Sequence, residues 1–266
     1  MLNLDLTDIF AAVIGMEHGL DRAAFEAAVA AAGALPTRVN AEFKNNTRHH
    51  YLGLPAHPTL ANEIQALVAA RPAKHVLVIG IGGSSLGAEM LQQAVGGGAT
   101  LHILDNTDPD QAAAIFARLD WSATVVNIVT KSGTTTESIA GAMLALPLLR
   151  RAVGARWQER VIVTTGDTIL RRWAAQQKIT VLAVPEPVGG RFSVLSAVGL
   201  LPACYAGVDI GALLAGAASA TRRLTTAAPT ANAALHFAMA MQWLHTHKGK
   251  AQLILMPYCH RLGAFY

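Results

Sequence analysis

The sequence predicts an α/β protein built on a doubly wound parallel sheet, with helices covering both faces. Short runs of β-branched and aliphatic residues alternate with longer helix-like segments from His75 onward. These runs are hydrophobic almost throughout, which is typical of strands buried on both faces of a parallel sheet. Loops rich in glycine and hydroxyl residues follow several of the runs, at the sheet edge where such proteins bind ligands.

Five strands and the helices between them are expected in order. The expected strands are residues 75–80, 101–105, 124–130, 160–164 and 179–184. The expected helices are residues 84–95, 109–119, 135–153 and 167–177. A helix-like segment separates each pair of consecutive strands, which is the connection that neighbouring parallel strands require.

The flanking regions complete the expected organisation. Residues 1–50 read as a helical region and connector, and residues 51–205 as the sheet domain. Residues 206–266 contain further helices and then a sixth strand-like run, AQLILM at residues 251–256. Because the sequence stops ten residues after this run, we expect the run to be the first strand of a second α/β domain that is cut off near its start.

Composition excludes several classes of protein. Of 266 residues, 52% are hydrophobic and 14% charged, which is incompatible with intrinsic disorder. The net charge of +4 is spread along the sequence without a basic run, so we expect no nucleic-acid partner, although the charge is compatible with a small anionic ligand.

Residues 193–220 are apolar enough to suggest a membrane span, but Pro202 and Asp209 interrupt them. Two buried helices joined near Gly207 are expected instead, with no membrane partner.

Cysteine and histidine usage points away from metal and disulfides. Cys204 and Cys259 lie far apart without metal-ligand spacing, so we expect two core thiols in a reducing, cytoplasmic setting. The N-terminus carries acidic residues where an export signal would need basic ones. His245 and His247 are expected at the surface of a helix end, and no metal site is expected.

The first loop with chemical character is GIGGSSLG, residues 80–87, directly after the first strand. Its glycines and the following helix N-terminus suit an anion. Asp105 stands at about the spacing of a dinucleotide-binding site, but Ser85 replaces the third glycine and Ala88 replaces the lysine of a P-loop. Ser84 and Ser85 would instead face a phosphate, unless the loop is an ordinary capped turn.

The second loop, TKSGTTTES at residues 130–138, follows the third strand. Its hydroxyl groups and Lys131 can bind phosphate oxygens, and we expect one phosphate to be held between this loop and the first. Thr134 and Glu137 have capping-box spacing, which predicts that Glu137 caps the next helix rather than acting as an acid.

The third loop, VGGRFSVLS at residues 188–196, presents Arg191 from a double-glycine turn. Ser193 is expected to cap the apolar helix that follows. Arg191 is either a solvated residue at a helix start or a cation for a developing oxyanion, and the residues alone leave both open.

Together the three loops resemble the phosphoglucose isomerase family, whose GxGGSxLG, S/T-K-S/T-x-T-T-x-E-T/S and GGR[FY]S motifs occur here in the same order. The resemblance covers roughly residues 73–266 and implies a sugar-isomerase (SIS) domain with a flavodoxin-like five-stranded sheet. It implies that Arg191, with the backbone of Gly190, is catalytic. The implied phosphate-binding residues are Gly83, Ser84, Thr130, Lys131, Ser132 and Thr135.

One part of the family pattern is missing. In the family an ESxGK motif, whose Glu transfers the proton, follows a segment like residues 257–266. The His implicated in ring opening and a late Lys of the family are also absent from the 266 residues. The resemblance therefore implies a glucose-6-phosphate isomerase, homodimeric at full length and without cofactor, of which these 266 residues bind hexose 6-phosphate but lack the base. The alternatives are a non-catalytic SIS module that binds a sugar phosphate as a regulatory signal and, in third place, a dinucleotide-dependent oxidoreductase.

Overall fold

A computed structural model of the chain describes residues 3–46 and 48–265. These residues group into two compact units, each discontinuous in sequence. The sheet unit comprises Gly53–Ala215 and Pro257–Tyr266, and the helical unit comprises Met1–Leu52 and Gly216–Met256. The expected division at residues 205 and 206 differs from this grouping, because the segment after residue 205 contributes to both units.

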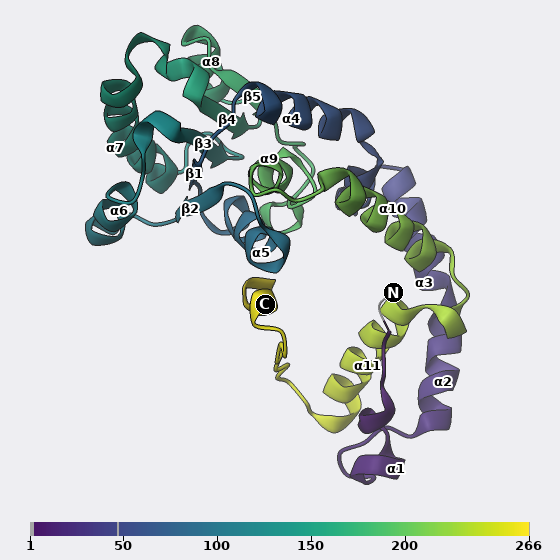
Figure 1. Cartoon of the computed structure of the whole chain (residues 1–266). Coiled ribbons are helices and arrows are strands. Elements are labelled where there is room, and N and C mark those ends of the chain that lie inside the picture. The colour runs from purple at the N-terminus through teal and green to yellow at the C-terminus, as the bar shows by residue number, and fades with distance from the viewer. Residues whose placement is uncertain (1–2, 47, 266) are drawn as a thin grey trace. The chain divides into compact units, whose positions relative to one another are not determined.

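The sheet unit is built on five parallel strands in the order β2-β1-β3-β4-β5 (Figure 1). The strands are β1 His75–Ile79, β2 Thr100–Leu104, β3 Thr124–Thr130, β4 Val161–Thr165 and β5 Thr180–Ala183. All five predicted strands are confirmed, with ends within one residue of those expected. Every residue of the central β3 is buried, which explains its nearly continuous apolar sequence.

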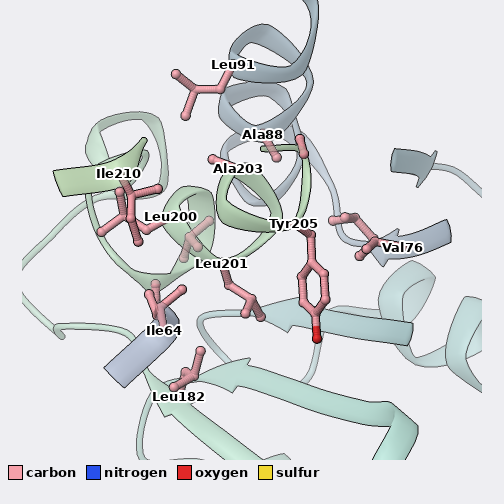
Figure 2. Close-up of a cluster of buried hydrophobic side chains, with 14 of the residues drawn as sticks. Ile64, Val76, Ala88, Leu91, Leu182, Leu200, Leu201, Ala203, Tyr205 and Ile210 are labelled. Carbon is pink, nitrogen blue, oxygen red and sulfur yellow. The ribbon is translucent and has the colours of Figure 1, made fainter. Parts of the chain in front are cut away.

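Helices cover both faces of the sheet, because alternate residues of each strand point to opposite sides. Val76 and Val78 of β1 join one core, which Figure 2 shows packed against α4, α5 and α9. Leu77 and Ile79 join the other core, against α6, α7 and α8. The covering helices are α4 Pro58–Ala70, α5 Leu86–Val95, α6 Pro109–Phe116, α7 Thr136–Val153, α8 Ile169–Gln176 and α9 Ala197–Tyr205. The four predicted helices among them are confirmed, with ends within three residues.

The order of the strands reverses between β1 and β3. The chain leaves β1 for its neighbour β2 and then crosses to β3 on the other side of β1. The connections that follow β1 and β3 therefore lead to opposite faces, into α5 and α7 respectively. In sheets of this kind a crevice forms at that point, outside the carboxyl ends of the strands.

The helical unit joins the beginning of the chain to a late helix. Its helices are α1 Ala11–Ile14, α2 Arg22–Ala31, α3 Leu35–Lys44 and α11 Ala233–Lys248, and α10 Ile210–Thr226 leads into it. α2 packs against α11, with Phe25 and Val29 meeting Leu235 and Ala240 in a buried core. The expected N-terminal helical region is confirmed, and its buried face is explained by α11.

Residues 251–256, expected to be a sixth strand, do not form one. Leu253, Ile254 and Met256 are largely exposed, and none of the described residues pairs with them. A strand is stable only when a neighbour satisfies its backbone hydrogen bonds, so apolar β-branched composition alone does not create one.

Two apolar stretches raise the question of a membrane. Residues 193–220 contain α9 and the first part of α10, which are joined at Gly207 as predicted. Nearly all of α9 is buried, but in α10 only Ile210 and Leu214 are, so the prediction of two buried helices is wrong for α10. The stretch Thr136–Arg160, which contains α7, is long and apolar enough to span a bilayer by length and composition. One face of α7 packs on the sheet through residues such as Ala145 and Leu149, and a core helix with such a face passes the same test.

Candidate functional site

Three loops lie at the carboxyl edge of the sheet. We call them the glycine loop, residues 80–87 after β1, the hydroxyl loop, residues 130–138 after β3, and the arginine turn, residues 188–196 after β5. The glycine loop and the hydroxyl loop follow the two strands between which the strand order reverses. The predicted site loops therefore flank the crevice of the sheet.

The glycine loop contains a short 3₁₀ turn, Gly82–Ser84, before α5 begins. Ser85 is buried and its hydroxyl donates a 3.3 Å hydrogen bond to the carbonyl of Gly82. The expectation that Ser85 faces a phosphate is therefore wrong, because its hydroxyl is used inside the loop. Ser84 is partly exposed and its hydroxyl makes no hydrogen bond with the described residues, so it is free for a ligand.

The glycine loop packs directly on the arginine turn through Gly83. A Cβ atom at this position would clash with the carbonyl group of Gly190 and lie 2.9 Å from the backbone nitrogen of Arg191. Only glycine permits two backbones to approach so closely. Gly83, Gly190 and Arg191, which the sequence assigned to one site, are thus in direct contact through the backbone.

Ser193 fixes this contact instead of capping α9. Its side chain is buried, and the hydroxyl donates a 2.7 Å hydrogen bond to the carbonyl of Gly190 and lies 3.3 Å from that of Gly83. The cap of α9 is Ser196, whose hydroxyl accepts from the backbone nitrogen of Val198. The predicted cap was wrong because both serines precede the apolar run, and sequence gives no means of choosing between them.

The hydroxyl loop gathers three of the predicted phosphate-binding residues. The hydroxyls of Thr130 and Thr135 are 2.8 Å apart, and that of Ser132 lies 3.5 Å from the first and 3.4 Å from the second. Gly133 makes the turn between them with a φ of +69°, and a Cβ atom there would clash with Thr168. The loop therefore gathers three hydroxyls at the start of α7, where Ser132 is exposed, Thr135 is partly exposed and Thr130 is buried.

The N-terminus of α7 has no side-chain cap. Thr135 occupies the cap position, but its hydroxyl faces Thr130 and accepts no hydrogen bond from the first turn. The capping box expected from Thr134 and Glu137 is absent from the described structure, and Glu137 is an exposed acid in the first turn. Backbone N–H groups of an uncapped first turn, beside three hydroxyls, are a suitable binding site for phosphate oxygens.

Lys131 connects the hydroxyl loop to the arginine turn. Its Nζ donates a 3.0 Å hydrogen bond to the carbonyl of Val188. The side chain also lines a hollow of about 480 Å³ together with Ser132, Asp167 and Glu186. The sequence does not predict this connection, because any type of residue can provide a backbone carbonyl.

Arg191 lies on the 3₁₀ turn Gly190–Phe192 and is exposed. It lines a hollow of about 680 Å³ whose other residues include Leu86, Met90 and Val194. Its guanidinium forms no ion pair or hydrogen bond with residues 3–46 or 48–265. A cation held on a fixed turn without an internal partner can interact with a bound anion.

No group of three or more His, Cys, Asp or Glu side chains that could hold a metal occurs among the described residues. Cys204 is half-buried, and burial raises the pKa of its thiol, whereas Cys259 is exposed. The prediction of two core thiols is therefore wrong for Cys259, which precedes the short 3₁₀ segment His260–Phe265.

Comparison with protein families gives a clear match. Residues 64–266 match the family model described as phosphoglucose isomerase. The chain is 34% identical over 273 residues to a probable glucose-6-phosphate isomerase of Haloquadratum walsbyi, covering 99% of this chain and 61% of the relative. It is 36% identical over 217 residues to a glucose-6-phosphate isomerase of Thermus thermophilus, covering 80% and 51%. The chain thus spans between 51% and 61% of the length of these two relatives.

Solved structures with the same fold agree. The structure of a hypothetical protein from Thermus thermophilus superposes with a TM-score of 0.78 at 32% identity, covering 85% of this chain and 56% of that one. The structure of a glucose-6-phosphate isomerase from Chlamydia trachomatis superposes with a TM-score of 0.70 at 27% identity, covering 78% and 41%. These matches confirm the predicted fold class.

Proposed function

Because the chain belongs to the phosphoglucose isomerase family, we propose that it supplies the phosphate anchor and the catalytic arginine of a glucose-6-phosphate isomerase. The reaction interconverts glucose 6-phosphate and fructose 6-phosphate through an enediolate. The observation that carries the proposal is the cluster of Thr130, Ser132 and Thr135 hydroxyls at the uncapped start of α7. Relatives that bear the name of this enzyme support the choice of substrate.

The phosphate anchor would use the hydroxyl loop and Ser84. Hydroxyl groups and first-turn N–H groups donate to the phosphate oxygens, and the α7 dipole favours their negative charge. Lys131 adds a positive charge at the edge of the same loop. Holding the phosphate in this way fixes one end of the sugar, so that the reacting carbons always reach the same place.

Arg191 would act at the reacting end. Moving a proton between neighbouring carbons places negative charge on an oxygen, and a guanidinium beside that oxygen stabilises the enediolate. The contact of Gly83 with Gly190 sets the arginine turn against the glycine loop, so the cation and the anchor share one framework. The backbone N–H of Gly190 can add a second donor.

The proton-transferring base is not among these residues. No ESxGK sequence occurs in the 266 residues. Glu137 is an exposed first-turn acid, and Glu186 lines the hollow of Lys131 and Ser132, beside the proposed phosphate anchor. Glu89 lines the hollow of Arg191, but its carboxylate accepts a 3.1 Å hydrogen bond from Gln93. We therefore propose that the 266 residues bind hexose phosphate without isomerising it at a useful rate, since a placed base alone contributes about 10² to 10⁴-fold.

Calorimetry tests the anchor. Replacing Lys131 by Ala together with Thr135 by Val should weaken binding of glucose 6-phosphate by roughly 2 to 4 kcal/mol, as the loss of charge-assisted contacts usually does. The matched control is Lys74→Met, which removes an exposed lysine just before β1. NAD, used as a negative control, should give no thermal protection. Unchanged affinity in the double variant would overturn the anchor.

A coupled assay tests the reaction. The 266-residue chain is compared with a form extended through the downstream sequence of its gene. Turnover by the extended form alone supports the proposal. Full turnover by the shorter chain would show that the base has been misplaced. An extended form that binds but never turns over would favour a non-catalytic sugar-phosphate module, and light scattering on it tests the proposed homodimer.

A further inference from the structure

The arginine turn carries Arg191 on a segment with little support of its own. Gly189 and Gly190 have no side chains to pack, and Arg191 is exposed. Within the turn the backbone nitrogen of Phe192 donates to the carbonyl of Gly189 at 3.0 Å. A segment of this composition is easily displaced unless contacts from outside hold it.

Among the described residues, contacts hold the turn at both of its ends. At the far end Ser193 and the backbone of Gly83 hold Gly190, as described above. At the near end the Nζ of Lys131 donates to the carbonyl of Val188 at 3.0 Å, across a sequence separation of 57 residues. Lys131 is the residue through which the hydroxyl loop touches this end of the turn by a hydrogen bond.

The ammonium group of Lys131 can serve two partners at once. It has three N–H donors, and the bond to Val188 uses one of them. Ser132, next to it in the chain, lines the same hollow and belongs to the hydroxyl group that would receive a phosphate. A phosphate oxygen there could accept a second N–H while the first remains on the carbonyl.

We propose that Lys131 is a positioning residue that ties the arginine turn to the hydroxyl loop, so that phosphate binding and the placement of Arg191 are coupled. This inference rests on the proposed function and adds to it. A bound phosphate restricts the motion of the Lys131 ammonium group. The hydrogen bond to the carbonyl of Val188 is then formed for more of the time, and the turn becomes more rigid. By thermodynamic linkage, an ordered turn then raises the affinity for phosphate by the same factor.

Hydrogen exchange on the whole chain tests the tether first. The amides of residues 189–193 are followed in the wild type, in Lys131→Met and in Lys131→Arg. Losing a charge-assisted hydrogen bond should speed exchange of the turn about tenfold in Lys131→Met. Lys131→Arg keeps a donor of similar reach and should restore slow exchange. Lys74→Met is the control, and exchange of the β1 and β3 amides reports whether each variant is folded.

Inorganic phosphate tests the coupling. At a concentration shown by calorimetry to saturate each protein, phosphate should slow exchange of residues 189–193 in the wild type and in Lys131→Arg. It should leave that exchange unchanged in Lys131→Met, whose hydroxyls still bind phosphate more weakly. Loss of a merely structural contact would not remove this dependence on phosphate.

The outcomes separate the inference from the proposed function. Normal phosphate binding with equal exchange in the wild type and Lys131→Met would overturn the tether and leave the anchor intact. Failure of the wild type to bind phosphate or glucose 6-phosphate would overturn the anchor, and the coupling with it. Slowing of the turn by phosphate in Lys131→Met as in the wild type would overturn the coupling alone.

Discussion

The glycine loop and the hydroxyl loop follow adjacent strands of one sheet, yet different forces hold them. The glycine loop lies against the arginine turn backbone to backbone, where no side chain larger than glycine fits at position 83. The hydroxyl loop is held by hydrogen bonds among its own side chains, with Thr130, Ser132 and Thr135 within 3.5 Å of one another. One half of the site is fixed by shape and the other by polar contacts that a ligand can replace.

The difference suggests that the glycine loop places the arginine turn and that the hydroxyl loop binds phosphate. The contact fixed by shape holds the Gly190 end of the arginine turn before the substrate arrives, which reduces the reorganisation left for the reaction. Hydroxyls that bond to one another satisfy their polarity while the site is empty and can turn to phosphate oxygens when it fills. Substitutions at the backbone contact of Gly83 should therefore cost mainly stability, whereas substitutions of the hydroxyl residues proposed to bind phosphate should cost affinity.

The largest effect is expected from Gly83→Ala. The added methyl group clashes with the Gly190 carbonyl, so the free energy of unfolding should fall by about 3 kcal/mol, as overpacked sites do. Gly216→Ala is the control, because Gly216 lies in α10 with no atom within 4 Å of the new methyl group. It should stabilise the chain by about 0.5–1 kcal/mol. Urea unfolding measures both, and a Gly83→Ala midpoint at the wild-type value would contradict the comparison.

Ser193→Ala tests the same contact from the other side. It leaves the carbonyl of Gly190 without its 2.7 Å hydrogen bond, so a loss of about 1.5 kcal/mol is expected. Ser196→Ala removes the cap of α9 and the 2.7 Å hydrogen bond that the Ser196 hydroxyl donates to the carbonyl of Ser193, but it leaves the carbonyl of Gly190 bonded, and it should cost about 1 kcal/mol. Hydrogen exchange of residues 189–192 should rise in Ser193→Ala and stay unchanged in Ser196→Ala. A rise in both variants would mean that helix α9, not Ser193, holds the turn.

Thr130→Val separates affinity from stability in the hydroxyl loop. The variant loses the contact with Thr135, and the free energy of unfolding should fall by about 1 kcal/mol while phosphate affinity falls about tenfold. Thr124→Val, at the other end of β3, loses a hydrogen bond to the carbonyl of Asp120. It should cost similar stability and leave affinity unchanged. Equal affinities in the two variants, measured by calorimetry, would remove Thr130 from the anchor.

The smallest effect on stability is expected from Ser84→Ala. Its hydroxyl has no partner in the described part of the chain, so the free energy of unfolding should change by less than about 0.5 kcal/mol. Binding of glucose 6-phosphate should still weaken by about 1 kcal/mol. Ser85→Ala removes the hydroxyl bonded to Gly82 and should not alter affinity. A larger loss of affinity in Ser85→Ala than in Ser84→Ala would show that the hydroxyl of Ser85, and not that of Ser84, contacts the ligand.

Much of the fold could be predicted because its signals are local. The five strands were identified within one residue, since burial on both faces forces each of them to be apolar. Gly207 predicted the junction of α9 and α10, which is also a local signal, because a single glycine is enough to end a helix. The predicted strand at residues 251–256 failed, since pairing depends on a neighbour that local sequence does not contain.

The sequence by itself determined the strands, the helices and the types of residue in the three site loops, because each is specified by a few consecutive side chains. Only the tertiary structure decided which atoms meet: Gly83 on Gly190, the Ser193 hydroxyl on the carbonyl of Gly190, and Lys131 on the carbonyl of Val188. The physical reason is that these contacts involve backbone groups, which every residue carries. They become partners only when the order of the strands brings distant loops to the same edge of the sheet.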